Sequence, residues 1–266
     1  PGMLWERAVA EIEARGGKLA LGARAVGVGL EGGRVASVAV QTNHGLERTA
    51  CADLITSMPI PALIAALEPR APEEVRRAAS GLRFRGFLTV CLIAGRERLF
   101  PDQWIYVHDP EVRMGRLQNY RNWSPEMCPE PGRTGLGLEY FCDRGDAFWN
   151  MADSDLAALG KAEADALGLV PAECVERWAV FRIPEAYPVY DSGYRARLAA
   201  LRSFLDPIAG LRTIGRSGLF RYNNMDHSMA TGMMAAENLL DGGRRDVWRV
   251  GEGGEYLESA GGGACT

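Results

Sequence analysis

The pattern of hydrophobic and polar positions predicts helices and strands from the start of the chain. Apolar residues recur at helical spacing in residues 3–15, and the Gly16-Gly17 pair that follows ends the predicted helix. Residues 24–30 and 34–42 are strand-like runs, and Gly32-Gly33 between them supplies turn residues. The first part of the chain is therefore predicted to form a helix followed by a β-hairpin.

The middle of the chain is predicted to be rich in strands. A short apolar strand at 52–59 leads into a helix that begins at Pro59, and Pro72-Glu73-Glu74 opens another short helix. Further strands are predicted at 87–94, 104–108, 116–123, 135–142 and 175–183, and further helices at 154–167 and 194–205. This order predicts a mixed or antiparallel sheet with helices, and an α/β fold class with an α+β part.

The C-terminal part combines a strand, a polar loop and a helix. Residues 211–214 predict a buried strand, and apolar residues at helical spacing predict a helix over 229–240, with Asp226 and Ser228 as candidate N-caps. The helix N-terminus would present free backbone N–H groups to an anionic or electron-rich group. An ordinary capped connection is the alternative, and it leaves the run Arg216–Asn224 (Arg-x-x-x-x-Arg-Tyr-Asn-Asn) unexplained.

Residues 215–228 resemble the flavin-contacting motif of FAD-dependent amine-oxidase-like oxidoreductases. Within that superfamily they are most similar to the protoporphyrinogen-oxidase-like branch, and they also resemble UDP-galactopyranose mutase. Segments 116–124, 138–142 and 186–191 extend the resemblance over nearly the whole chain. It implies FAD as cofactor, with the loop beside the isoalloxazine ring. The implied cofactor contacts are Gly215, Arg216, Tyr222, Asn223, Asn224, Met225, Asp226, His227 and Ser228.

A second glycine pattern is not interpreted as a cofactor site. Residues 27–32 match GxGxxG, but they lead into a hairpin turn, whereas a dinucleotide fingerprint opens a helix after a strand. The resemblance places the backbone around Val26 beside the adenine of FAD. Packing of Val26 in the strand core is the alternative.

The resemblance also implies a domain organisation. Residues 1–58 are expected to form part of a Rossmann-like FAD-binding domain, and residues 59–210 a substrate-binding domain. Residues 211–250 would return to the FAD-binding domain, and residues 251–266 would form a flexible, glycine-rich tail. The GxGxxG unit that begins such proteins is not found here, and the chain opens on Pro1-Gly2-Met3. We therefore expect a fragment of a longer flavoenzyme.

Arg216 bears on the substrate class. In many amine-oxidase-like enzymes an acidic residue takes its place, so the arginine disfavours an amine and favours an anionic or phosphorylated ligand. Pairing of Arg216 with a carboxylate inside the core is the alternative.

No catalytic residue is assigned, but several residues are candidates for substrate contact. These are Asn119, Tyr187, Tyr190 and Arg221. Packing in the core or at its rim is the alternative for the tyrosines, for Tyr222, and for Asn119 with its neighbours Asn122 and Trp123. Glu139 lies within an apolar strand, either facing outward or as an acid–base group with a raised pKa.

Composition narrows the remaining possibilities. The chain has 266 residues and a net charge of −4, with scattered basic residues, which argues against nucleic-acid binding. Its apolar segments are shorter than the roughly 20 residues of a membrane helix. The six cysteines form no CxxC pair and the three histidines have no metal-site spacing. We expect no metal, free thiols, a cytoplasmic location and a small-molecule substrate.

Three functions remain open. The first is part of an FAD-dependent oxidoreductase that transfers a hydride from an organic substrate to flavin. The second is a flavin-dependent UDP-sugar mutase, which is an isomerase. The third is a non-catalytic fragment that binds no flavin.

Overall fold

The structure is a computed structural model that describes residues 2–243 and 245–251. The chain divides into two compact units, and each is described by itself. Unit 1 comprises residues 1–81 and 195–266, and unit 2 comprises residues 82–194. The tail predicted at 251–266 lies outside the described residues, apart from Gly251.

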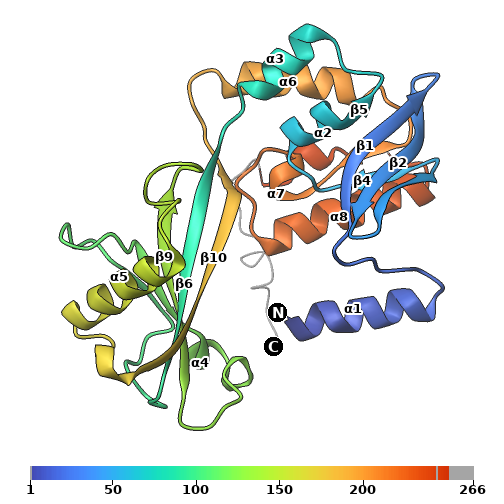
Figure 1. Cartoon of the computed structure of the whole chain (residues 1–266). Helices are drawn as coiled ribbons and strands as arrows, with labels where there is room; N and C mark the ends of the chain where they lie inside the picture. The colour runs from blue at the N-terminus through green and yellow to red at the C-terminus, as the bar shows by residue number, and fades with distance from the viewer. Residues whose placement is uncertain (1, 244, 252–266) are drawn as a thin grey trace, which may run out of the picture. The chain divides into compact units, whose positions relative to one another are not determined.

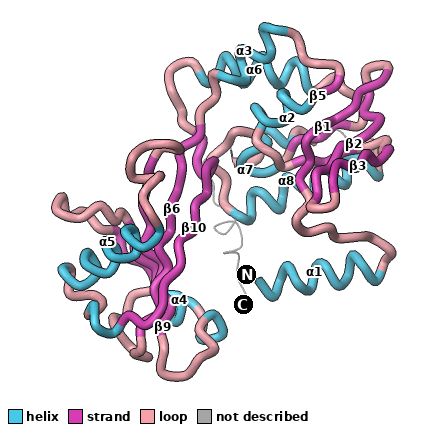
Figure 2. The backbone as a smooth tube through the Cα atoms, viewed as in Figure 1, coloured by secondary structure: helices cyan, strands magenta, loops and turns pink. Residues whose placement is uncertain are grey.

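Unit 1 contains a four-stranded sheet built from hairpins. Strands β1 (Arg24–Glu31), β2 (Arg34–Thr42) and β3 (Gly45–Ala50) are antiparallel neighbours, and β5 (Leu67–Glu68) pairs in parallel with β1 (Figure 2). Gly32 and Gly33 form the turn with φ of 57° and 79°, a conformation that favours glycine. The predicted hairpin is confirmed, and residues 27–32 do not open a helix.

A second, two-stranded sheet lies in the same unit. Strand β4 (Leu54–Thr56) pairs in parallel with β11 (Leu211–Thr213). The helices of this unit are α1 (Gly2–Ala14), α2 (Ile60–Ala66), α3 (Glu73–Ser80), α6 (Tyr194–Leu205), α7 (Gly215–Gly218) and α8 (Met225–Leu240). A short 3₁₀ helix, η3 (Val247–Arg249), follows α8. The core of unit 1 includes the fully buried side chains of Ile60, Leu63 and Leu201.

The unit boundaries differ from the predicted domain limits at residues 59 and 210. The chain remains in unit 1 beyond residue 59 because β5 pairs with β1, and Pro59 is the N-cap residue of α2 in the same unit. It returns to unit 1 at Arg195, and the Val35 N–H donates to the Ala209 carbonyl, 2.9 Å away. The assignment of the units to a cofactor-binding and a substrate-binding domain stays a prediction.

Helix α1 forms where predicted, but its apolar face is not buried. No residue of α1 is buried, and Leu4 and Ile12 are 49% and 51% exposed. The predicted apolar face of α1 is therefore at most half-buried.

Unit 2 is built on a five-stranded antiparallel sheet. The strand order is β10-β6-β9-β8-β7. The strands are β6 (Phe84–Ala94), β7 (Trp104–Tyr106), β8 (Arg116–Asn119), β9 (Thr134–Cys142) and β10 (Val175–Pro188). Helix α5 (Asp153–Ala166) packs against β6 and β10 (Figure 1), over core residues such as Leu88, Val90 and Leu138. This mixture of helices and mixed or antiparallel sheets confirms the predicted fold class.

The predicted strand at 116–123 is shorter than expected. Strand β8 ends at Asn119, whose side-chain oxygen accepts a hydrogen bond from the Asn122 N–H and so caps α4 (Tyr120–Trp123). Two 3₁₀ helices, η1 (Pro125–Met127) and η2 (Ala172–Cys174), complete unit 2. Local capping therefore overrides the strand pattern here.

A buried carboxylate joins α5 to the sheet. Glu163 is 6% exposed and accepts hydrogen bonds from the backbone N–H groups of Arg113 (2.6 Å) and Met114 (3.2 Å) and from the Tyr140 hydroxyl (2.8 Å). Burial and the nearby carboxylate raise the pKa of Tyr140, so the phenol keeps its proton and donates. Three donors therefore depend on one side chain.

Removing the Glu163 carboxylate is expected to destabilise unit 2. In Glu163→Ala the two backbone N–H groups and the Tyr140 hydroxyl lose their acceptor, at a cost of about 3 kcal/mol of unfolding free energy. Urea unfolding followed by tryptophan fluorescence measures this. Tyr140→Phe, which removes a single hydrogen bond, should cost about 1 kcal/mol. Equal stability of Glu163→Ala and the exposed control Glu173→Ala would contradict this account.

Candidate functional site

The connection from β11 to α8 is held by a small set of close contacts. Gly215 follows β11 with φ of +72°, and its N–H donates to Oγ1 of Thr231, 3.0 Å away. Thr231 is fully buried and donates in turn to the Ser228 carbonyl at 2.7 Å. A Cβ atom on Gly218 would lie 3.1 Å from the Thr56 carbonyl oxygen, which makes glycine the fitting residue there. These contacts fix the start of the segment 215–228.

Helix α8 begins earlier than predicted. It starts at Met225, so the expected N-caps Asp226 and Ser228 both lie in its first turn, and their assignment as caps is wrong. Asn224 takes the N-cap position in an extended conformation, and its side chain makes no capping hydrogen bond. The polar loop therefore ends at Asn224, and the first backbone N–H groups of α8 have no side-chain cap.

Asn223 is the most unusual residue of this segment. It is 1% exposed, yet neither Nδ2 nor Oδ1 has a hydrogen-bond partner among the described residues. Its backbone is used, because the N–H donates to the Arg221 carbonyl at 2.9 Å and the carbonyl accepts from Arg216 Nε at 2.8 Å. Buried side-chain amides are normally hydrogen-bonded, so this one indicates a missing polar partner.

The side chains around Asn223 hold one another in place. The Arg216 guanidinium lies 5.1 Å from the ring centroid of Tyr222, in addition to its bond to the Asn223 carbonyl. His227 is 7% exposed, and its Nδ1 is 3.0 Å from Oδ1 of Asp226. A Cβ atom on Gly251 would be 3.2 Å from Oδ1 of Asn223, so the chain after η3 passes next to the amide.

The structure brings together most of the predicted cofactor contacts, but not all. Those from Gly215 to Ser228 form one continuous segment of unit 1, together with Arg221. Val26 lies in β1 at an irregular register and is 42% exposed, so it is not strand core. Its predicted place beside an adenine stays a prediction.

The candidate substrate residues of unit 2 have different surroundings. Asn119 is 1% exposed and caps α4, and Tyr190 stacks on Tyr194 with ring centroids 4.5 Å apart. The Tyr187 hydroxyl accepts a hydrogen bond from Nη2 of Arg116 at 3.0 Å. Their role in substrate binding stays a prediction, and the structure does not gather the three into one cluster.

Arg116 is the centre of a cluster that the sequence did not single out. It is 8% exposed, pairs with Glu139, and lies within 6.0 Å of the ring centroids of Phe87, Trp104, Tyr106 and Phe141. Burial opposes the charge of Arg116, but the Tyr187 hydrogen bond and the Glu139 carboxylate raise its pKa above the ordinary value. The guanidinium therefore stays protonated on the sheet face opposite Leu117 and Leu138.

The Glu139 carboxylate is buried, whereas the sequence predicts that it faces outward. It does face away from Leu138 and Tyr140, as strand alternation requires, but it is only 4% exposed. It is bound by Arg116 and by the Gln118 side-chain amide. Alternation in β8 could have placed Arg116 and Gln118 on one face, but their pairing with β9 depends on a register that one sequence does not reveal.

Two further properties of the described residues concern function. Among them, no group of histidine, cysteine, aspartate and glutamate side chains is arranged to hold a metal ion. None of the helices within this part of the chain is both long and apolar enough to cross a bilayer. The described cysteines, Cys51, Cys91, Cys128, Cys142 and Cys174, are free thiols, while Cys265 lies outside the described residues.

Comparison with known proteins identifies the fold. No protein-family model and no curated protein matches the chain. Among solved structures, reduced UDP-galactopyranose mutase matches 85% of this chain with 48% of its own, at 18% identity and a TM-score of 0.71. Putrescine oxidase bound to putrescine matches 86% of this chain with 51% of its own, at 15% identity and a TM-score of 0.60.

A third solved structure also matches the chain. A protoporphyrinogen-oxidase-like protein from Exiguobacterium sp. 255-15 matches 73% of this chain with 42% of its own, at 17% identity and a TM-score of 0.53. The chain therefore has the fold that these solved structures share over the matched part. The chain spans about half the length of these solved structures.

The Arg116–Glu139 pair is expected to behave as one unit in unfolding experiments. Arg116→Met alone leaves a buried carboxylate without its partner and should cost about 3 kcal/mol of unfolding free energy. The double variant Arg116→Met/Glu139→Leu should cost less than the sum of the two single variants, by about 1–3 kcal/mol. Urea unfolding of the wild type, the two single variants and the double variant completes this double-mutant cycle. Strict additivity of the two losses would show that the pair does not interact.

Proposed function

We propose that this chain is part of an FAD-dependent oxidoreductase and that residues 215–228 contact the flavin. The observation that carries the proposal is the buried, unpartnered side-chain amide of Asn223 next to the uncapped N-terminus of α8. An amide offers both a donor and an acceptor, and a helix N-terminus offers backbone N–H donors and a positive dipole end. This donor set suits the polar edge of a flavin ring.

The residues present fit such a ring in charge as well as in hydrogen bonding. When bound, FAD supplies the hydride-accepting chemistry that the protein side chains lack. The N–H groups of α8 and the Asn223 amide would stabilise negative charge at the ring edge through fixed dipoles, without reorganisation of solvent. The Asp226 carboxylate lies in the same helical turn, and His227 Nδ1 pairs with it at 3.0 Å.

The surrounding contacts keep these groups in position. The Gly215 N–H bond to Thr231 and the Arg216 bond to the Asn223 carbonyl hold both ends of the loop. The Tyr222 ring contacts the Arg216 guanidinium and restricts the motion of this long side chain. Arg216 therefore favours a substrate or cofactor group with negative charge.

The remaining predictions from the sequence are kept as part of the proposal. We propose Tyr187, Tyr190, Asn119 and Arg221 as substrate contacts, Val26 as a contact for the adenine, and the cytoplasm as the location. The chain spans about half of the similar solved structures, and we propose that the activity belongs to a longer protein that contains this chain.

A flavin-dependent sugar-nucleotide mutase is the second candidate. It is favoured by the TM-score of 0.71 over 85% of this chain with reduced UDP-galactopyranose mutase. Turnover that consumes an electron acceptor supports the oxidoreductase. Interconversion of UDP-sugars by the reduced protein, with no net electron transfer, would replace it with the mutase.

Asn223→Leu separates ligand binding from folding. Leucine has a similar volume and no unsatisfied polar atoms, so the 266-residue chain should keep its stability or gain about 1 kcal/mol in urea unfolding. In the product of the complete reading frame, the same variant should weaken FAD retention about tenfold, because one hydrogen-bonded pair is lost. Flavin absorbance after gel filtration measures the retention.

The matched control is Asn238→Leu, in helix α8, which follows the loop that holds Asn223. The Asn238 amide is satisfied by the Arg245 backbone, through bonds of 2.8 and 2.9 Å, so its loss should lower stability and leave FAD retention unchanged. A large loss of stability in Asn223→Leu would mean that the amide has a partner within the protein. A complete gene product that retains no FAD would favour the non-catalytic alternative.

A further inference from the structure

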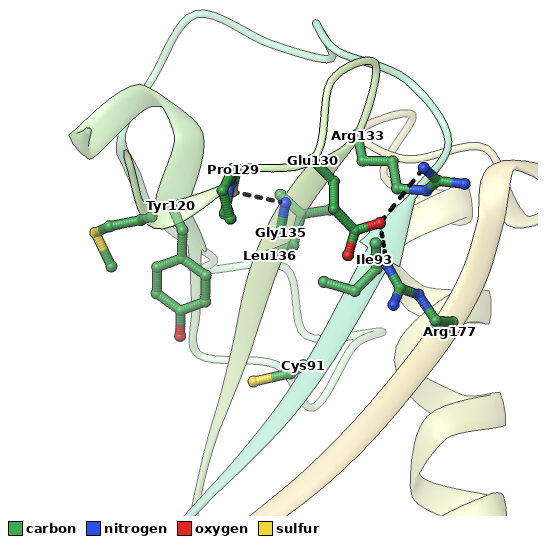
Figure 3. A pocket seen from close by; sticks show the side chains of 11 residues that line it. Cys91, Ile93, Tyr120, Pro129, Glu130, Arg133, Gly135, Leu136 and Arg177 are labelled. Carbon is green, nitrogen blue, oxygen red and sulfur yellow. Dashed lines mark hydrogen bonds and ion pairs between the residues drawn. The ribbon is translucent and has the colours of Figure 1, made fainter. Parts of the chain in front are cut away.

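Unit 2 contains a hollow that uses none of the residues proposed to contact the flavin. Its volume is about 280 Å³, and it is lined by parts of β6, β9, β10, α4 and η1 and by the loop 128–133 (Figure 3). Apolar side chains and two thiols make up most of this lining: Ile93, Tyr120, Met127, Leu136, Cys91 and Cys128. A mostly apolar hollow of this size is the usual form of a small-molecule site.

The Tyr120 ring forms one wall, and two glycines of β9 make room for it. A Cβ atom on Gly135 would lie 3.6 Å from Tyr120 Cδ2, and a Cβ atom on Gly137 would overlap the Tyr120 hydroxyl. The ring therefore stands directly on β9. Aromatic rings attract one another in stacked or tilted pairs, and sulfur atoms make favourable contacts with ring edges. Together with the thiols of Cys91 and Cys128, this wall suits an aromatic ring better than an alkyl chain.

A single arginine holds the loop that forms another wall. The Arg121 side chain is 15% exposed and donates to the carbonyls of Cys128 (2.8 Å), Glu130 (2.9 Å) and Arg133 (2.7 Å). These three bonds fix the loop 128–133 before any ligand arrives. A preformed wall lowers the entropy that a ligand must lose on binding.

The charged groups at the mouth of the hollow balance one another. Figure 3 shows Glu130 between Arg133 and Arg177, and both Glu130 oxygens accept from Arg177, at 2.7 and 2.8 Å. Arg133 Nε donates to Glu176 at 2.6 Å. The Arg177 hydrogen bond lowers the pKa of Glu130, and the Glu176 hydrogen bond raises the pKa of Arg133, so both stay charged. Two guanidinium groups thus face two carboxylates, and the mouth favours neither an anion nor a cation.

Behind its mouth, the hollow offers no charge to a ligand. None of the residues that line it, all within the described part of the chain, has a buried side-chain nitrogen or oxygen without a hydrogen-bond partner. Burial raises the pKa of the Tyr120 hydroxyl and of the neighbouring Cys91 thiol, so both stay neutral. The Cys128 sulfur accepts from the Gly135 N–H at 3.2 Å. A charged ligand group would lose its hydration here without compensation.

We propose that this hollow binds a small, uncharged aromatic molecule. Its ring lies against Tyr120, and the thiols of Cys91 and Cys128 contact the ring edge. Ile93 and Leu136 cover the remaining apolar surface. An apolar cavity of about 150 Å³ holds benzene, so about 280 Å³ suits two fused rings. Naphthalene, which has no polar group, is the probe.

The first test compares an aromatic with a saturated ligand of the same size. Headspace gas chromatography over solutions of the 266-residue chain measures the bound fractions of naphthalene and cis-decalin. Each affinity is divided by the partition coefficient of that ligand from water into octane, which removes the difference in hydrophobicity. The corrected affinity of naphthalene should be about two- to tenfold higher, because of the ring and sulfur contacts. Equal corrected affinities, or no binding of naphthalene, would overturn the proposal.

The second test uses the sign of the ligand charge. Calorimetric titration should give 2-naphthoate and 2-naphthylmethylammonium affinities within about twofold of each other, because the mouth is neutral. Glu130→Gln should make 2-naphthoate the tighter ligand by about two- to fivefold, and Arg177→Gln should reverse this preference. A stronger preference of the unaltered chain for either ion would overturn the choice of an uncharged ligand. No change in either variant would show that the ring does not bind behind this mouth.

A filling variant tests the place of binding. Met127 is 43% exposed, so Met127→Trp adds a large ring to the lining without removing a core side chain, and it should weaken naphthalene binding at least about tenfold. Met3→Trp, at a residue of α1 that is 74% exposed, is the matched control and should leave binding unchanged. Equal losses in the two variants would contradict the assigned site.

Thiol labelling locates the bound ring without any substitution. Naphthalene should slow the alkylation of Cys91 and Cys128 by iodoacetamide at least severalfold, measured by mass spectrometry of peptides. Cys51 and Cys174 do not line the hollow and serve as internal controls. Equal labelling of all four thiols with and without naphthalene would place the bound ring elsewhere and overturn the proposal.

Discussion

The hydrogen bond between the Gly215 N–H and Oγ1 of Thr231 sets the position of the whole flavin-binding candidate segment. Strand β11 ends at Thr213 and α8 begins at Met225, so the chain changes direction within a connection that holds only the short helix α7. Thr231 lies on α8 and binds Gly215, the second residue after the strand, so helix and strand are fixed to each other. Gly215 and Phe220, with φ of 72° and 47°, supply the left-handed turns that such a short path requires.

The buried Asn223 amide differs from the buried charged groups of unit 2. In unit 2, Glu163 and the Arg116–Glu139 pair are bound by side chains or backbone of the same unit, so they contribute order to the folded state. In unit 1, the Asn223 amide is buried without a hydrogen-bond partner among the described residues, which costs stability. This contrast is why we assign the ligand-binding role to the segment around Asn223 and a structural role to Glu163.

The sequence predicted the order and type of most elements, because period and turn residues decide those locally. The hairpin at Gly32-Gly33 and the helix α5 are examples. It misplaced the start of α8, because Asp226 and Ser228 are good N-cap residues whose local preference does not determine where the chain leaves the loop. It also missed the partners of Glu139 and the burial of Glu163, since both depend on contacts between distant strands and helices. No cap or periodicity signal carries that information.

The packing of Tyr120 on the glycines of β9 has a consequence for how this fold can change in evolution. The ring occupies the space that a side chain at residue 137 would need, so the two positions cannot vary independently. A homologue with alanine or serine at 137 would have to carry a smaller residue at 120, or move α4 away from the sheet. Sequence covariation between these two positions would therefore report on how closely α4 approaches the sheet, even where no structure is known.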